Sequence, residues 1–353
     1  MKHVYFLVFN ITNSAGTERA VINLSNILCN EEDFKVGIIS ISSITGNPYY
    51  ELDSRVSIYH LGINNSTKNI VKKLTAYKKV MNRIYDIVPE GGYVLGTDIP
   101  YNILISFLKK RKKIGCSHMG YKSAHFMRNV MRYIFYRKLD ALVVLTENDK
   151  KYYSFIKNTY VIPNSLSFAP KTKDNYDSKQ ILSIGRLNYQ KGFEFLIDAA
   201  KIVVDKHSDW KFVICGSGEE YEELVKKIQT LKLENNMQII PPTKNITALY
   251  ENSSIYVMSS RFEGLPMVLI EAQSYSLPIV SFDCPEGPAS IIHNNEDGYL
   301  VKLFDINMLA EKICYLIENK SERIRLGSNS FTNSKQFSTD SVREKWLIFF
   351  QEN

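Results

Sequence analysis

The sequence has few residues that could build a metal centre or a disulfide framework. Its 353 residues include five cysteines and six histidines, and no two cysteines form a CxxC pair. Since these cysteines and histidines do not cluster at the spacing of metal ligands, no metal site is expected. The cysteines stand singly in apolar surroundings, which predicts buried free thiols in a reducing compartment.

Long apolar runs and low-complexity segments are also missing. No stretch of about 18 apolar residues could cross a membrane as a helix. The apolar start, 1–9, lacks a small-residue cleavage site, so a buried strand is expected there and not a signal peptide. Hydrophobic residues make up 44% and charged residues 23%, which excludes a disordered or fibrous chain. With about 150 residues per domain, the length predicts two domains. A cytoplasmic protein is expected, either free or peripheral on the inner face of the cell membrane.

The charge is unevenly distributed along the chain. Residues 1–165 hold 23 Lys and Arg against 12 Asp and Glu, a net charge of +11, whereas the rest holds 21 against 25, a net charge of −4. In the basic segment 122–138, apolar residues recur at helical spacing. Two interpretations stay open: a helix lying on an anionic membrane, or a helix whose apolar stripe packs on its own core while its cations face water. No nucleic-acid-binding module accompanies the charge, so nucleic acid is not expected as a partner.

Strand-like apolar runs alternate with amphipathic stretches. The expected strands are 4–9, 35–41, 93–95, 113–117, 141–145, 160–162, 180–184, 210–215, 237–240, 255–258, 278–282 and 298–301. The expected helices are 18–29, 70–85, 124–138, 147–156, 193–205, 219–231, 246–250, 266–275 and 308–318. This alternation predicts two α/β domains with parallel sheets covered on both faces. The polar, aperiodic segment 165–178 predicts a boundary between domains 1–164 and 165–334.

Several strand-to-helix turns carry residues suited to binding an anion, and ligands of such sheets bind at the carboxyl ends of strands. In the first, Gly16 opens a helix and lets backbone N–H groups approach an anion. In the second, Gly185 ends a strand, and Arg186 and Lys191 follow on a loop from which both can reach a diphosphate. In a third, His118 follows a strand, and a purely structural histidine is the alternative.

The turn 261–272 combines two carboxylates with a helix start. Pro266 is expected as the first helical residue, where its missing N–H costs nothing. Glu263 precedes the helix and Glu271 lies within it, so the two can contact different parts of one elongated ligand. The alternative is a capping Glu263 and a solvated Glu271.

Three functions are compatible with these turns when the turns are considered by themselves. Glu263 and Glu271 could act as the acid and the nucleophile of a glycoside hydrolase. The turn 215–218 resembles a dinucleotide loop for NAD, but it lacks the third glycine of that fingerprint. A protein that binds a nucleotide sugar without catalysis is the third.

The segments 183–192 and 263–272 together resemble glycosyltransferase family 4, including its pair of glutamates separated by seven residues. Residues 16–19, 163–164 and 287–301 also fit, whereas Ala15 and Pro241–Pro242 depart from the family's usual glycines. The resemblance implies the GT-B fold, two Rossmann-like domains whose parallel sheets face a central cleft, with a last helix within 335–353 packing back on the first domain. It also implies transfer with retention of anomeric configuration and without a metal.

The resemblance also implies roles for the candidate residues. Arg186 and Lys191 would neutralise the leaving diphosphate, Glu271 would bind the ribose and Glu263 the donor sugar. His118 would lie near the sugar and Gly16 beside the phosphates, while the donor pocket would be shaped by Gly185, Gly264, Leu265 and Pro266. The donor is expected to be a nucleotide sugar, a UDP-hexose or UDP-N-acetylhexosamine. Together with the basic first domain, the resemblance predicts a lipid-diphosphate-linked saccharide as acceptor, in the synthesis of bacterial capsule, exopolysaccharide or O-antigen.

Overall fold

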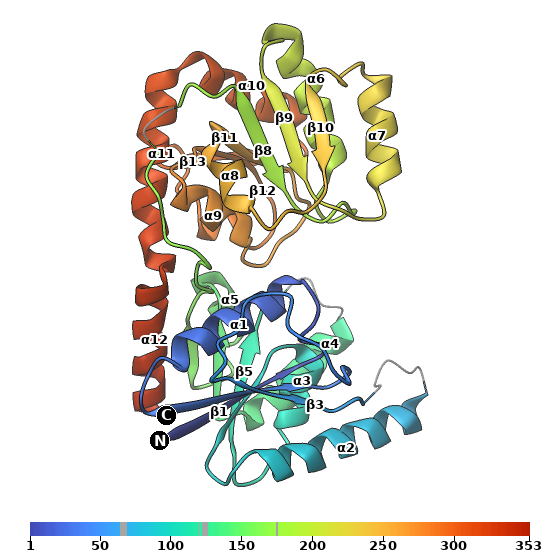
Figure 1. Ribbon diagram of the computed structural model, residues 1–353, viewed down its shortest axis with the longest axis vertical. Helices are drawn as coiled ribbons and strands as arrows, with labels where there is room; N and C mark the ends of the chain where they lie inside the picture. Colours follow the sequence, from blue (N-terminus) through green and yellow to red (C-terminus); the bar gives the residue numbers. More distant parts are fainter. Residues whose placement is uncertain (64–68, 119, 122–125, 174–175) are drawn as a thin grey trace. The chain divides into compact units, whose positions relative to one another are not determined.

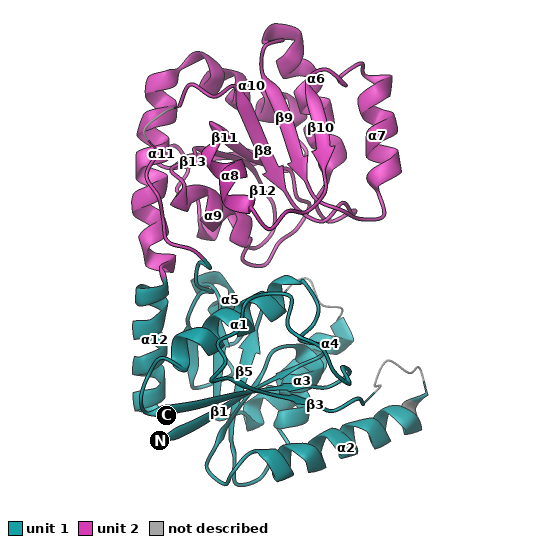
Figure 2. Cartoon of the chain, viewed as in Figure 1, with its two compact units in different colours: residues 1–167, 339–353 teal, residues 168–338 magenta. Residues whose placement is uncertain are grey.

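The computed structural model describes residues 1–63, 69–118, 120–121, 126–173 and 176–353 (Figure 1). The chain forms two compact units (Figure 2). Unit 1 comprises Met1–Ser167 and Thr339–Asn353, and unit 2 comprises Phe168–Ser338. Both changes of unit lie a few residues after the boundaries expected from the sequence.

Unit 1 is built on a parallel sheet in the order β3-β2-β1-β4-β5-β6-β7. Alternate residues of the central strand β1 enter two hydrophobic clusters, one on each face of the sheet. The edge strand β3 was not predicted, because Ser57 is exposed, the other three residues are only partly buried, and the four together carry little apolar pattern. The strands are β1 (Lys2–Val8), β2 (Phe34–Ser40), β3 (Ser57–His60), β4 (Tyr93–Gly96), β5 (Lys112–Ser117), β6 (Ala141–Val144) and β7 (Thr159–Val161).

Helices cover both faces of this sheet. Residues of α1 and α12 join one cluster, and residues of α2 and α3 join the other. The seven-residue α3, with a proline in its first turn, is too short to show a helical period, and it was not predicted. The helices are α1 (Gly16–Leu28), α2 (Ile70–Ile87), α3 (Ile99–Ile105), α4 (Phe126–Phe135), α5 (Glu147–Tyr152) and α12 (Thr339–Glu352), with a 3-10 turn η2 (Tyr136–Lys138).

Helix α4 does not bury its apolar side chains, as the interpretation with the stripe on the core requires. Its buried residue is Arg132, which is fully buried and donates hydrogen bonds to Tyr121 O (3.1 Å) and Asn129 Oδ1 (3.0 Å). The exposed side chains include Phe126, Met127, Val130, Met131, Tyr133 and Ile134. The interpretation in which the apolar stripe packs on the core is therefore wrong. The expected helix start at 124–125 and the cation Lys122 lie outside the described residues, as does Met119.

Unit 2 contains a second parallel sheet in the order β10-β9-β8-β11-β12-β13. In both sheets the strand order runs outward from the first strand, then reverses to its other side, as in Rossmann-type domains. The prediction of two Rossmann-like domains with parallel sheets is thus confirmed. The strands are β8 (Gln180–Ile184), β9 (Lys211–Cys215), β10 (Met237–Ile240), β11 (Ile255–Met258), β12 (Ile279–Asp283) and β13 (Gly298–Lys302).

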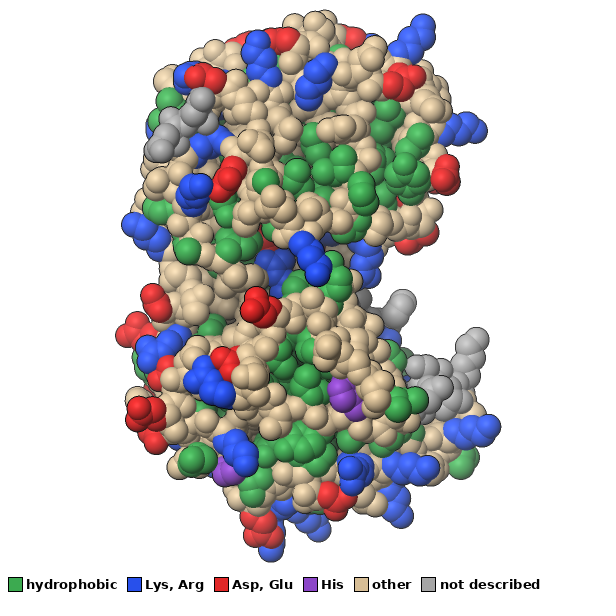
Figure 3. All heavy atoms as spheres, in the orientation of Figure 1, with side chains coloured by type: hydrophobic (Ala, Val, Ile, Leu, Met, Phe, Trp, Pro, Cys, Tyr) green, Lys and Arg blue, Asp and Glu red, His purple; other side chains and the backbone are tan. Residues whose placement is uncertain are grey.

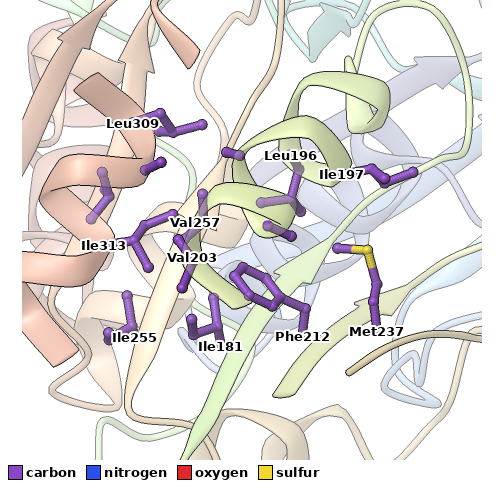
Figure 4. Packing of buried hydrophobic residues seen from close by; sticks show 14 of the residues in the cluster. Ile181, Leu196, Ile197, Val203, Phe212, Met237, Ile255, Val257, Leu309 and Ile313 are labelled. Atoms are coloured by element: carbon purple, nitrogen blue, oxygen red, sulfur yellow. The ribbon is translucent and has the colours of Figure 1, made fainter. Parts of the chain in front are cut away.

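The core of unit 2 lies where helices α6 and α10 pack on the sheet. Figure 4 shows Val203 and Leu196 from α6, Ile313 from α10 and Phe212 from β9 within this cluster. Helix α11 was not predicted, because its contacts are made largely by polar and small residues such as Arg323 and Gly327. The helices are α6 (Phe193–Lys206), α7 (Tyr221–Thr230), α8 (Ile246–Glu251), α9 (Met267–Ser274), α10 (Ile306–Glu318) and α11 (Lys320–Ser334), with 3-10 turns η3 (Pro288–Ser290) and η4 (Lys335–Phe337).

Helix α12 follows unit 2 in the chain but packs in unit 1. Trp346, Phe349 and Phe350 are buried in the cluster that also contains α1. The Arg343 guanidinium forms an ion pair with Glu31 at the end of α1. These contacts make α12 a structural part of unit 1.

The cysteines and the lengths of the helices complete the description. All five cysteines are buried free thiols, as predicted. None of the helices in the described part of the chain combines the length and the apolarity needed to span a bilayer.

Candidate active site

The candidate residues of unit 2 gather at the carboxyl ends of two neighbouring strands. β8 and β11 are adjacent at the point where the strand order reverses. The loop 185–192 follows β8, and the loop 259–266 follows β11. In open α/β sheets a ligand binds beyond the strand ends at such a reversal. The topology therefore explains why two motifs far apart in the sequence meet.

A buried ion pair joins the two loops. Lys191 Nζ lies 2.6 Å from Glu263 Oε1, and the side chains are 16% and 7% exposed. Ser260 Oγ donates to the same carboxylate oxygen at 2.6 Å, and Gln190 Nε2 lies 3.4 Å from Glu263 Oε2. A Cβ at Gly185 would lie 3.2 Å from the Lys191 stem, so the glycine leaves room for it. Glu263 is thus held by a cation and a hydroxyl and is not a helix cap in solvent.

Arg186 lies in the same loop but in a different environment. Its side chain is exposed and forms no hydrogen bond or ion pair within the described residues. The next residue, Leu187, is fully buried, and its N–H donates to Ser217 O at 2.9 Å. The loop is therefore anchored beside Arg186, while the guanidinium itself is accessible to a ligand.

Arg261 ties the two loops together, a role that sequence reasoning missed. Its backbone N–H donates to Gln190 O at 2.8 Å, and its Nη1 donates to Tyr189 O at 2.5 Å. The guanidinium lies 3.9 Å from the centroid of the Tyr189 ring and forms an ion pair with Glu194 of α6. The signal available in the sequence was a cation, Arg261, in the loop after β11, together with a tyrosine, Tyr189, in the loop after β8.

Two glycines allow close approach of the backbone around the site. Gly192 has φ +58°, and a Cβ there would lie 2.5 Å from Ser259 O. Gly287 has φ +112°, and a Cβ there would lie 2.4 Å from Gly264 O. Both positions combine a left-handed backbone with a steric limit, so they require glycine. The loops after β8, β11 and β12 can then pack directly on one another.

Helix α9 carries the second carboxylate. The helix begins at Met267, so Pro266 is the N-cap and not the first helical residue, which corrects the expectation by one position. Leu269 N–H donates to Pro266 O at 3.0 Å, and Leu265 is buried. Such an N-terminus presents N–H donors that the helix itself cannot satisfy.

Glu271 is fully buried inside α9 and is not a solvated side chain. Its Oε2 accepts a hydrogen bond from the hydroxyl of Tyr250 at 2.7 Å. The Tyr256 side chain is also close: burial raises its pKa well above the usual value, and the charges of Glu271 and Glu263 act in the same direction. The carboxylate thus lies close to two buried phenols, and that of Tyr250 donates to it.

Cys284 follows β12 next to Glu263. Burial raises the pKa of its thiol to about 12, and the charge of Glu263 adds to the effect. At neutral pH the thiol is therefore protonated and a poor nucleophile.

His118 and Gly16 belong to unit 1. His118 follows β5, and burial lowers its pKa to about 4, so its ring is neutral at pH 7. It lines a cavity together with Thr97, Ser117 and Asn164. Gly16 is the first residue of α1, and a Cβ there would meet nothing within 4 Å. Within the described residues, no group of three or more His, Cys, Asp and Glu side chains could hold a metal ion.

Comparison with known proteins identifies related chains. The family model "Glycosyl transferases group 1" matches residues 167–332, a range that contains all the candidate site residues of unit 2. The amylovoran biosynthesis glycosyltransferase AmsD of Erwinia amylovora is 33% identical, over 98% of this chain and 99% of its own length.

A second relative, from Campylobacter jejuni, is 28% identical over 100% of this chain and 99% of its own length. It is named "GalNAc-alpha-(1->4)-GalNAc-alpha-(1->3)-diNAcBac-PP-undecaprenol alpha-1,4-N-acetyl-D-galactosaminyltransferase". Among solved structures, Staphylococcus aureus TarM, a mutant in complex with Fondaparinux, alpha-GlcNAc-glycerol and UDP, is similar with a TM-score of 0.83 and 19% identity. The match covers 99% of this chain and 100% of that one, which establishes a common fold.

Proposed function

This chain belongs to the group 1 glycosyl transferases and is a glycosyltransferase of the GT-B fold, and we propose that it transfers a hexose or N-acetylhexosamine from a UDP-sugar with retention of configuration and without a metal ion. The observation that carries the proposal is the buried contact between Lys191 and Glu263 at the ends of β8 and β11. It joins a cation suited to a diphosphate to a carboxylate suited to sugar hydroxyls.

The departing diphosphate needs positive groups nearby that stabilise its negative charge. As the bond between the anomeric carbon and the phosphate oxygen breaks, negative charge grows on the diphosphate. Lys191, the accessible Arg186 and the N–H groups at the start of α9 would stabilise that charge more in the transition state than in the substrate. These groups would supply what a divalent cation supplies in other transferases.

The carboxylates would hold the rest of the donor. Glu271 would accept hydrogen bonds from the ribose hydroxyls, and Glu263 would accept them from hydroxyls of the donor sugar. Gly185, Gly264, Leu265 and Pro266 would shape the pocket between them. The proposed positions of His118 near the sugar and of Gly16 beside the phosphates rest on the family resemblance alone. The acceptor oxygen would form the new bond on the face that the diphosphate leaves, and its proton would pass to a diphosphate oxygen.

A donor screen tests the proposal. With UDP- and GDP-sugars offered alongside a lipid-diphosphate saccharide, we expect release of UDP, a product that keeps the anomeric configuration by NMR, and unchanged transfer in the presence of EDTA. Release of free sugar from a simple glycoside without nucleotide would instead indicate a hydrolase. Saturable UDP binding without transfer to any acceptor would indicate a binding protein.

The proposed acceptor is a saccharide on a lipid diphosphate, which places the reaction at an anionic membrane surface in bacterial polysaccharide synthesis. The name of the Campylobacter relative includes such a lipid. Figure 3 shows Lys and Arg side chains along the exposed face of α2 in unit 1. The exposed apolar side chains of α4 are accompanied by Arg128 in the same helix and by Arg137 and Lys138 in η2, and α4 holds no acidic residue. This combination suits the head-group region of an anionic bilayer.

Replacing two apolar residues of α4 by glutamate tests whether this helix binds a membrane surface. The variant Met127→Glu/Ile134→Glu is expected to lose co-sedimentation with vesicles of equal parts phosphatidylcholine and phosphatidylglycerol at low salt. The wild type should bind these vesicles and bind pure phosphatidylcholine weakly. Met308→Glu, which alters an exposed methionine of unit 2, serves as the control and should bind like the wild type. Equal binding by both variants would exclude α4 as the docking face.

A further inference from the structure

Tyr250 is a buried phenol bonded to the buried carboxylate of Glu271. Both side chains have no exposed surface, and the hydroxyl lies 2.7 Å from Glu271 Oε2. In this bond the tyrosine hydroxyl donates its single proton, and the carboxylate oxygen accepts it. The direction of the hydrogen bond is therefore fixed.

The ring of Tyr250 is itself held firmly. It stacks on Tyr275 with ring centroids 5.4 Å apart and an interplanar angle of 14°. On another side the ring of Tyr256 lies 6.1 Å away at 32°. Because the ring is enclosed in this way, the hydroxyl can move little, and the carboxylate that it holds is restrained with it.

We infer that Tyr250 is a positioning residue for the donor: it fixes the Glu271 carboxylate in the orientation that receives the ribose hydroxyls. The inference rests on the proposed ribose-binding role of Glu271. Without this donor the carboxylate would lose one of the contacts that restrain rotation about its terminal bond, which is a soft torsion. Each rotation would take the acceptor oxygen away from the ribose, so the enzyme would lose selectivity for the hydroxyls before it lost the pocket.

The test measures ribose selectivity. Dissociation constants are determined by calorimetry for UDP and for 2′,3′-dideoxy-UDP, which lacks the ribose hydroxyls. The wild type is expected to bind UDP about tenfold or more tightly than the dideoxy compound, as for hydrogen bonds to a charged group. In Tyr250→Phe this ratio should fall to about threefold or less, with the affinity for the dideoxy compound nearly unchanged.

Three further variants interpret the result. Tyr275→Phe removes a hydroxyl from the same ring stack, and Tyr250 is the phenol of this stack that donates to Glu271, so the ratio for Tyr275→Phe should lie close to that of the wild type. Tyr250→His keeps a ring N–H donor and should recover part of the selectivity. This variant also tests the positioning role of Tyr250 if Tyr250→Phe does not fold. In a Glu271→Ala background, Tyr250→Phe should have no further effect on the ratio.

The outcomes separate the inference from the proposal beneath it. If Glu271→Ala retains the wild-type ratio, the ribose role of Glu271 is wrong. If Glu271→Ala loses the ratio while folded Tyr250→Phe keeps it, the ribose role stands and the positioning role of Tyr250 is overturned. An equal loss in Tyr275→Phe would show that the ring stack matters and not the hydroxyl.

Discussion

Turnover of Lys191→Ala is expected to fall about a hundredfold or more at saturating donor, since removing one preorganised donor to a developing anion typically costs this much. Lys191 is 16% exposed and is aimed by its contact with Glu263, so water would replace it poorly. The measurement is steady-state release of the nucleoside diphosphate. The fall should appear in kcat, because the charge that Lys191 meets grows as the bond breaks.

Two controls separate catalysis from folding in this experiment. Lys201 forms an exposed ion pair with Asp205 on α6, and Lys201→Ala should change turnover little. Lys191→Ala also leaves the buried Glu263 carboxylate without its cation, which lowers the melting temperature. The double variant Lys191→Met/Glu263→Gln carries neither charge and should recover part of that stability without recovering activity. Wild-type turnover in folded Lys191→Ala would remove Lys191 from the proposed mechanism.

Glu271→Ala is expected to raise the KM for the donor about tenfold or more, because the ribose loses a charged acceptor. The carboxylate is fully buried, and its loss also removes a hydrogen-bond acceptor from the buried Tyr250 hydroxyl. The free energy of unfolding should therefore fall by about 1–3 kcal/mol. Donor-saturation kinetics and thermal unfolding, measured on the same preparation, check both effects.

The matched control for Glu271 is an exposed carboxylate of the same unit. Glu222 lies in the first turn of α7, and Glu222→Ala should leave the KM and the unfolding temperature close to wild-type values. Glu271→Gln keeps the size of the side chain and removes its charge, so its KM should lie between those of the wild type and Glu271→Ala. An unchanged KM in folded Glu271→Ala and Glu271→Gln would exclude Glu271 as the ribose acceptor.

Local patterns in the sequence were sufficient to predict much of the fold. The alternation of apolar runs and amphipathic stretches predicted most strands and helices, and hence the two parallel sheets, because burial on both faces of a strand leaves a continuous apolar run. The motifs around Lys191 and Glu263 were also recognisable. The start of α9 shifted by one residue, since the backbone of Pro266 is extended, with φ −72° and ψ 96°, and not helical.

The contacts within the site could not be predicted in the same way. Lys191 and Glu263 are 72 residues apart, and only the order of the strands brings them together. The bond between Tyr250 and Glu271 joins two helices and left no periodic signal. In α4, the helical period identified an apolar stripe but not the direction in which it points, and the structure shows that Arg132 is the buried residue of this helix.

The packing of α12 has a consequence for how the protein is made. Val342, Trp346, Phe349 and Phe350 complete a core whose other buried members come from the first 162 residues. A ribosome must therefore synthesise all of unit 2 before unit 1 can close that core, whereas unit 2 is continuous in the chain and can fold as soon as it emerges. Until α12 has been synthesised, the apolar residues that it covers in unit 1 stay exposed, so we expect unit 1 to become protease-resistant after unit 2.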